Sequence, residues 1–222
     1  MKKKIVLIKR VIFVAALIPF ARLLLGWLAL LEPSLASSVT AHIGLSFPPL
    51  GGDPIADTIN RTGDWAIAFV IISLGVTPLR RLTGWNEVVR LRRMLGLFGF
   101  FYATCHMGTW IFIDKQLDIG WMVDDIIKRK FITVGMATWL MLLALAITST
   151  TGWIRRLGRR WQQLHRLAYA AGVGAVIHFS QLVKSDETVP IRWAVILTVF
   201  FGVRIWWTLR KRQLHARQLL PS

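Results

Sequence analysis

The sequence contains six apolar runs of about the length that a helix needs to cross a lipid bilayer. They lie near residues 11–31, 64–79, 94–113, 131–149, 162–183 and 191–209. A spanning helix takes about 20 mostly apolar residues, because the hydrocarbon core is roughly 30 Å thick and a helix rises about 1.5 Å per residue. The runs do not alternate between polar and apolar residues as barrel strands do. We therefore predict an all-α integral membrane protein with a bundle of six transmembrane helices.

The basic residues predict which way the bundle faces. Of the 28 Lys and Arg residues, 19 lie in the N-terminal arm, the 80–93 loop, the 150–166 segment and the C-terminal tail. Six spans place these four segments on one side of the membrane, where Glu87 is the only acid among them. Because cytoplasmic loops carry an excess of Lys and Arg, we expect both termini in the cytoplasm.

The formal net charge of +17 has the same explanation. Clustered Lys and Arg also neutralise nucleic-acid phosphates, but here the basic residues line one membrane face, where anionic lipid headgroups attract them. We expect membrane lipid and no nucleic acid as a partner. The first apolar run is too long for a removable signal, and we retain it as a span. No repeat or linker is evident in the sequence, so we treat residues 1–222 as one transmembrane domain.

Cys105 is the only cysteine, which limits the kinds of metal site. One cysteine excludes an internal disulfide, a cysteine-based zinc site and a four-thiolate iron–sulfur cluster. The surrounding sequence CHMGT is also not the C-x-x-C-H pattern that attaches haem covalently. A metal bound inside the membrane would have to use histidine.

Three of the five histidines lie inside the apolar runs. His106 is in the third run, and His165 and His178 are in the fifth. Ionisable residues in spans are costly and usually mark a functional path, and neutral imidazole is a common axial ligand of haem iron. The alternative reading, in which each imidazole hydrogen-bonds a neighbouring helix and has no further role, stays open.

The positions of these histidines along the helices favour one shared haem. His106 lies about 18 Å from the inner end of its run, and His178 lies about 20 Å outward from His165. His106 and His178 are therefore expected at similar depth, as ligands of one iron. His165 is too far away to share it and serves another site or none. On an ideal helix the rings of His165 and His178 point about 140° apart, and we expect Gly172 and Gly174 to allow a bend or a close helix contact.

Arginines near the inner ends of these runs are expected to contact haem propionates. Arg92 and Arg93 cannot ligate iron, because a guanidinium stays protonated, but they can hold a carboxylate by paired hydrogen bonds. Arg166, next to His165, is assigned the same role. Met94 is either the partner of His165 at a second haem or an ordinary core residue.

Several long segments resemble the MsrQ family, the haem-binding membrane subunits of a bacterial periplasmic methionine sulfoxide reductase system. They are GDWAIAFVIISLGVTPLRRLTG (63–84), LRRMLGLFGFFYATCHM (91–107), KRKFITVGM (128–136), LALAITSTTGWIRRLGRRWQQLHRLAY (143–169) and VIHFSQLVK (176–184).

The resemblance implies a ferric reductase-like transmembrane domain in the bacterial inner membrane that carries b-type haem. It implies His106, His165 and His178 as the haem ligands. Relatives with two haems have a histidine pair on both helices, whereas the third run here has only His106, so one or two haems remain open. The resemblance also implies FMN, although no residues of this sequence can be assigned to it.

The implied activity is electron transfer to a partner that carries the catalytic site. That partner is a periplasmic molybdopterin-containing reductase, which repairs oxidised methionines. The implied donor is the quinone pool or a cytosolic flavin reductase, and the absence of a G-x-G-x-x-G motif also points to an external donor. Two alternatives stay open: a stand-alone ferric or quinone reductase-like cytochrome b, and a haem-free transporter that uses the histidines for protons or packing.

Overall fold

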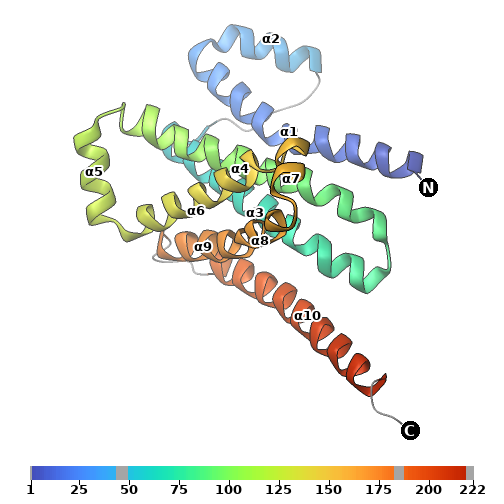
Figure 1. The fold of residues 1–222 in the computed structure, drawn as a ribbon. Coiled ribbons are helices and arrows are strands. Elements are labelled where there is room, and N and C mark those ends of the chain that lie inside the picture. Colours follow the sequence, from blue (N-terminus) through green and yellow to red (C-terminus); the bar gives the residue numbers. More distant parts are fainter. Residues whose placement is uncertain (1, 44–49, 183–187, 219–222) are drawn as a thin grey trace. The chain divides into compact units, whose positions relative to one another are not determined.

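The computed structural model describes residues 2–43, 50–182 and 188–218, and all regular structure in these ranges is helical. Figure 1 shows the helices in chain order. Their bounds are α1 (Lys2–Leu31), α2 (Pro33–Ile43), α3 (Pro54–Thr83), η1 (Asn86–Val88), α4 (Val89–Gly108), η2 (Thr109–Asp114), α5 (Ile119–Lys128), α6 (Lys130–Ile147), α7 (Thr151–Leu157), α8 (Arg159–Leu164), α9 (Leu167–Leu182) and α10 (Thr188–Gln218). The prediction of an all-α fold is confirmed.

Helices long and apolar enough to cross a membrane account for five of the six predicted runs. Within the described residues they are Lys4–Leu31, Pro54–Thr83, Asn86–Asp114, Lys130–Ile147 and Thr188–Leu214. The fifth run along the chain, near 162–183, contains α9, which has 16 residues. The six-span count and the cytoplasmic location of both termini stay predictions.

The chain divides into two compact units. Unit 1 consists of Met1–Ala68 and Leu97–Lys128, and unit 2 consists of Phe69–Gly96 and Arg129–Ser222. The chain passes from one unit to the other within α3, within α4 and between α5 and α6. Each unit is described by itself below.

A tyrosine of α4 bonds to two backbone groups of α1 in unit 1. In a regular α-helix the Phe20 amide would donate to the Ala16 carbonyl. The Phe20 amide donates to the Tyr102 hydroxyl at 3.1 Å, and that hydroxyl donates to the Ala16 carbonyl at 2.7 Å. Pro19, which has no amide hydrogen, lies at this point. Tyr102 is 1% exposed, so its hydroxyl satisfies both backbone groups out of contact with solvent.

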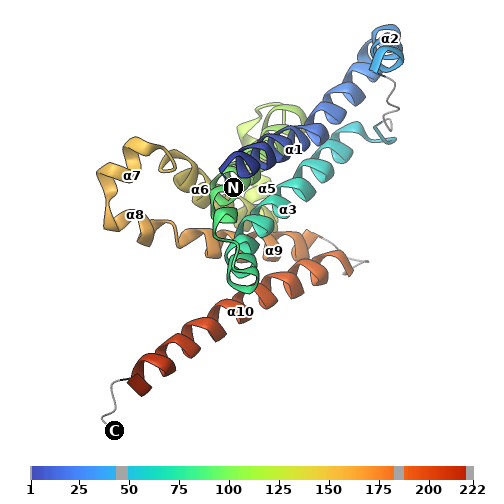
Figure 2. The same cartoon turned by 90° about the vertical axis from the view of Figure 1, so that its right-hand side faces the viewer.

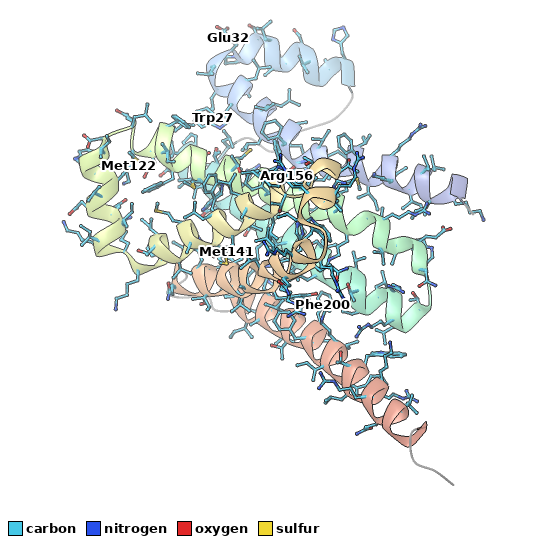
Figure 3. The ribbon with its side chains drawn as sticks, in the orientation of Figure 1. Trp27, Glu32, Met122, Met141, Arg156 and Phe200 are labelled. Atoms are coloured by element: carbon cyan, nitrogen blue, oxygen red, sulfur yellow. The ribbon has the colours of Figure 1, made fainter. Side chains whose placement is uncertain are left out.

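Further contacts hold α1 against α3 and α4 in unit 1. The Trp27 indole nitrogen donates to the Thr58 hydroxyl at 2.9 Å, and Trp27 is labelled on α1 in Figure 3. Edge-to-face ring contacts join α1 to α4 at Phe13 with Phe98 and at Phe20 with Phe101. Unit 1 thus packs its three long helical segments through aromatic side chains.

The third predicted run, which lies in unit 1 from Leu97 onward, ends in a π-helix that is followed by an ionic cluster. The π-helical segment η2 covers Thr109–Asp114, and the Lys115 amide donates to the Trp110 carbonyl. The Lys115 ammonium lies 3.1 Å from the Asp114 carboxylate and 2.8 Å from that of Asp125 on α5. This triad fixes α5 to the end of the preceding helix.

Unit 2 is packed closely through small residues. A Cβ added at Gly172 would lie 2.7 Å from Leu74, and one at Gly174 would overlap the Thr138 hydroxyl. The close helix contact expected at these two glycines is confirmed, with α6 and α9 as the helices that meet at Gly174.

Phe200 on α10 makes a similar contact with α3. Its ring, labelled in Figure 3, would lie 2.6 Å from a Cβ at Gly75. Such contacts let helix backbones approach one another, as in membrane bundles.

The fifth predicted run is not one continuous helix, because a turn divides it. Figure 2 shows the chain turning from α6 through α7 and α8 before it enters α9. Gly158, with a φ of +50°, joins α7 to α8, and His165 and Arg166 form the turn between α8 and α9. The angle of 140° calculated for an unbroken helix therefore does not apply.

The outside of both units is rich in large apolar side chains. Examples with more than half of their surface exposed are Leu7, Leu31, Phe112, Leu140, Val199 and Ile205. A water-soluble fold would bury a large share of such residues. Their exposure along the long helices is expected where lipid chains take the place of water.

Candidate functional site

His106 on α4 lies against α3 within unit 1. Its Nδ1 atom is 2.8 Å from the carbonyl oxygen of Ile59. A Cβ added at Gly63, one helical turn after Ile59, would lie 3.2 Å from the same Nδ1 and 3.3 Å from Cε1. The imidazole therefore rests directly on the α3 backbone.

His178 on α9 has the corresponding position against α6 within unit 2. Its Nδ1 atom is 2.7 Å from the carbonyl oxygen of Phe131. A Cβ added at Gly135, one turn after Phe131, would lie 2.8 Å from both Nδ1 and Cε1 of the ring. The Phe131 ring also lies beside the imidazole, with centroids 6.0 Å apart.

His165 has different surroundings in unit 2. Its Nε2 atom is 3.2 Å from the Thr148 hydroxyl, and its ring stacks on Trp161 with centroids 4.0 Å apart. The Trp161 indole nitrogen donates to the Thr148 carbonyl at 2.9 Å. These contacts fix the turn between α8 and α9, which contains His165.

The hydrogen bonds of His106 and His178 assign their tautomer. A carbonyl oxygen only accepts, so Nδ1 carries the proton in both residues and Nε2 carries the lone pair. Histidines that bind metal through Nε2 commonly donate Nδ1–H to a carbonyl or carboxylate in this way. Both residues therefore fit the role of an axial haem ligand. Among the described residues no three His, Cys, Asp or Glu side chains gather into a group that could hold a metal ion.

The three predicted arginines are placed differently. Arg92 is half-buried in unit 2, donates to the Tyr169 hydroxyl at 3.4 Å and lies 5.9 Å from the centre of that ring. Arg204 of α10 lies over the same ring at 4.5 Å. Arg93 and Arg166 are exposed. Two guanidinium groups thus share one aromatic ring, an arrangement suited to an anionic group such as a carboxylate.

Sequence reasoning missed the partners of the histidines. The hydrogen-bond acceptors are the backbone carbonyls of Ile59 and Phe131, which cannot be identified from the residue types in the sequence. Gly63 and Gly135 were not singled out, although each lies 43 residues before a histidine of a predicted apolar run. That shared spacing was the signal that could have identified them. Arg204 was seen only as part of an apolar run.

The family described as "Ferric reductase like transmembrane component" matches residues 62–176, which include His106 and His165 and end two residues before His178. No solved structure matches the chain.

Several curated relatives named "Protein-methionine-sulfoxide reductase heme-binding subunit MsrQ" are similar over most of their length. The protein of Xanthomonas axonopodis pv. citri (strain 306) is 50% identical over 172 residues, 78% of this chain and 79% of the relative. That of Xanthomonas oryzae pv. oryzae (strain MAFF 311018) is 44% identical over 217 residues, 98% and 94% of the two chains. That of Herminiimonas arsenicoxydans is 42% identical over 212 residues, 94% and 89%.

Proposed function

Because this chain belongs to the MsrQ family of ferric reductase-like transmembrane proteins, we propose that it is the b-type haem electron-transfer subunit of a methionine sulfoxide reductase system. It passes electrons across the bacterial inner membrane to a periplasmic molybdopterin-dependent reductase that repairs oxidised proteins. The observation that carries the proposal is the pair of imidazoles, His106 and His178, whose Nδ1 atoms bond helix carbonyls and whose Nε2 atoms hold the lone pair.

The residues of this chain have distinct parts in that function. His106 and His178 supply imidazole nitrogens to haem iron, and Arg92 holds a propionate. Bound haem supplies one-electron chemistry, with a potential set by its axial ligands and by burial. His165 belongs to the same proposed set of haem-binding positions, at a place other than the iron of His106 and His178. Whether His106 and His178 share one iron stays a prediction, since they belong to different units.

The remaining parts of the system come from the resemblance. We expect six spans with both termini in the cytoplasm, and electrons from the quinone pool or a cytosolic flavin reductase. FMN stays a prediction of the resemblance and is tested by the flavin content of the purified protein.

A difference spectrum tests haem binding. The protein is expressed in a bacterial membrane and purified in detergent, and the dithionite-reduced minus oxidised spectrum is recorded with pyridine haemochrome quantitation. We expect b-type bands. Folded protein without such bands would exclude the proposal and favour a haem-free transporter.

Co-expression with a periplasmic methionine sulfoxide reductase tests the direction of electron flow. Membranes that contain both proteins are reduced with a quinol, and turnover of a methionine sulfoxide substrate is followed. The ferric reductase-like fold favours a stand-alone ferric or quinone reductase as the second candidate. A protein that binds haem and reduces ferric chelates, but never delivers electrons to the partner, would favour this candidate.

A further inference from the structure

His106 and His178 have the same three-part environment, repeated along the chain. In both cases the residue whose carbonyl accepts from Nδ1 lies 47 positions before the histidine. In both cases a glycine lies four positions after that acceptor, against the imidazole ring. Adding 72 to each number of the first set gives the second: Ile59, Gly63 and His106 correspond to Phe131, Gly135 and His178.

The glycine has a physical reason to lie four residues after the acceptor. In an α-helix the carbonyl of residue i accepts from the amide of residue i+4 and keeps a second lone pair. Side chains tilt toward the helix N-terminus, so the side chain of residue i+4 covers the carbonyl of residue i. Glycine at i+4 leaves that carbonyl open to a neighbouring helix, and the imidazole fills the space that a Cβ would take.

We propose that Gly63 and Gly135 are matched positioning residues, which hold His106 and His178 in the orientation and tautomer required to present Nε2 to haem iron. The inference rests on the proposed haem-binding function. By leaving the Ile59 and Phe131 carbonyls open, the glycines permit the Nδ1–H hydrogen bond, and this bond makes the imidazole a more basic ligand.

His165 has no counterpart in the repeat. The position 72 residues before it is Arg93, which is exposed. Among the glycines of the described residues none lies against its ring, and it meets the Thr148 hydroxyl through Nε2. The duplicated environment therefore includes His106 and His178 and excludes His165.

Alanine at each glycine tests the proposal. At Gly63 the ring has to move by a few tenths of an ångström, and at Gly135, where the added Cβ would lie 2.8 Å from the ring, it has to move further. Either shift weakens the Nδ1–H bond. A less basic imidazole stabilises ferric iron less, so the midpoint potential becomes more positive, with a larger change for Gly135→Ala. The milder Gly63→Ala keeps the test valid if Gly135→Ala does not fold.

Two other helical glycines serve as matched controls. A Cβ at Gly202 on α10 meets nothing within 4 Å, and one at Gly108 on α4 meets only Phe112 at 3.8 Å. The full-length variants are purified with their haem, and haem content, redox midpoint and the low-spin ferric electron paramagnetic resonance signal are recorded. We expect Gly202→Ala and Gly108→Ala to match the parent protein.

The outcomes separate this inference from the proposed function. A shifted midpoint and altered resonance in Gly63→Ala or Gly135→Ala, or loss of haem from the folded variant while the controls keep it, supports the positioning role. Unchanged potential and resonance in the folded glycine variants overturns it and leaves the proposed function intact. A parent protein without haem overturns the proposed function itself.

Discussion

The Nε2 atom of His165 lies 3.2 Å from the hydroxyl oxygen of Thr148. That hydroxyl donates its own hydrogen to the Ala144 carbonyl at 2.7 Å, so its oxygen accepts from His165. Nε2 of His165 therefore carries the proton, which is the opposite of the assignment for His106 and His178. The three histidines of the predicted apolar runs fall into two chemical classes.

This difference predicts that His165 is dispensable for the haem of the other two histidines. We expect His165→Ala to keep that haem, measured as haem per protein after purification. Thr148→Val, which removes the hydroxyl at nearly constant volume, should behave in the same way. Complete loss of haem from folded His165→Ala would place this residue at the same iron and contradict the prediction.

His106→Ala and His178→Ala should each remove the same haem. A six-coordinate iron that loses one of two axial imidazoles no longer has its low-spin spectrum, and the haem is held less firmly. Haem content and the reduced absorption bands measure the effect. Full retention of haem by either variant would mean that the two histidines do not share one iron.

Arg92→Gln should weaken haem binding, with Arg93→Gln as the matched control. Arg92 lies against Tyr169 within unit 2, whereas Arg93 is exposed. A hydrogen bond to a charged group contributes about 1.5–3 kcal/mol, so we expect haem affinity to fall about tenfold or more. Loss of a nearby positive charge also lowers the midpoint potential, opposite in sign to the glycine variants. Equal effects in the two arginine variants would contradict a specific propionate contact.

Tyr102→Phe should destabilise the fold, because it leaves the Phe20 amide and the Ala16 carbonyl without the hydroxyl that joins them. A buried polar group that loses its partner costs about 1–3 kcal/mol. Thermal unfolding in detergent measures the change. The only other tyrosine, Tyr169, accepts a longer bond of 3.4 Å from Arg92, so Tyr169→Phe should cost less. The reverse order would show that the backbone of α1 adjusts without Tyr102.

Asp125→Asn should lower thermal stability more than Asp124→Asn at the neighbouring position. Asp125 pairs with Lys115 where both side chains are little exposed, at 11% and 13%, whereas Asp124 and Lys128 form a pair that is 54% and 70% exposed. Breaking a buried pair costs about 3–5 kcal/mol, and we expect the lower end because Asp114 still contacts Lys115. An exposed pair contributes about 0–1 kcal/mol.

The same ionic cluster predicts a response to alkaline pH. The hydrogen bond to Asp125 is the main cause that raises the pKa of Lys115 above its usual 10.5. A raised lysine pKa means that the stabilisation is complete below about pH 10 and is lost as the pH rises through the folded-state pKa. Unfolding midpoints measured from pH 7 to 11 check this. A loss of the Lys115 contribution below pH 9 would contradict it.

The sequence was sufficient to predict five long apolar helices, because long apolar runs leave few alternatives in a membrane, but it gave no prediction of the shorter helices α2 and α5. It did not predict the break at His165 and Arg166, beside which the Trp161 indole donates to the Thr148 carbonyl. It also gave no warning that the Tyr102 hydroxyl would bond to the backbone of α1 near Pro19. Both contacts join residues that are not neighbours in the sequence.

The candidate site residues could be selected from the sequence, but their surroundings could not. Histidine inside an apolar run is conspicuous, so His106, His165 and His178 could be selected from their positions alone. Their hydrogen-bond partners could not be selected, because every residue type has a backbone carbonyl. The two glycines are recognised only when the number of residues from Gly63 to His106 is compared with that from Gly135 to His178. Structure was also needed to separate His165 from the other two.

The apolar side chains on the outside of both units have a consequence for how the protein is made. Proteins with such exteriors aggregate in water, because their exposed apolar side chains associate with one another. Synthesis must therefore deliver each helix to the bilayer as it leaves the ribosome, before the histidines can meet the backbones that orient them.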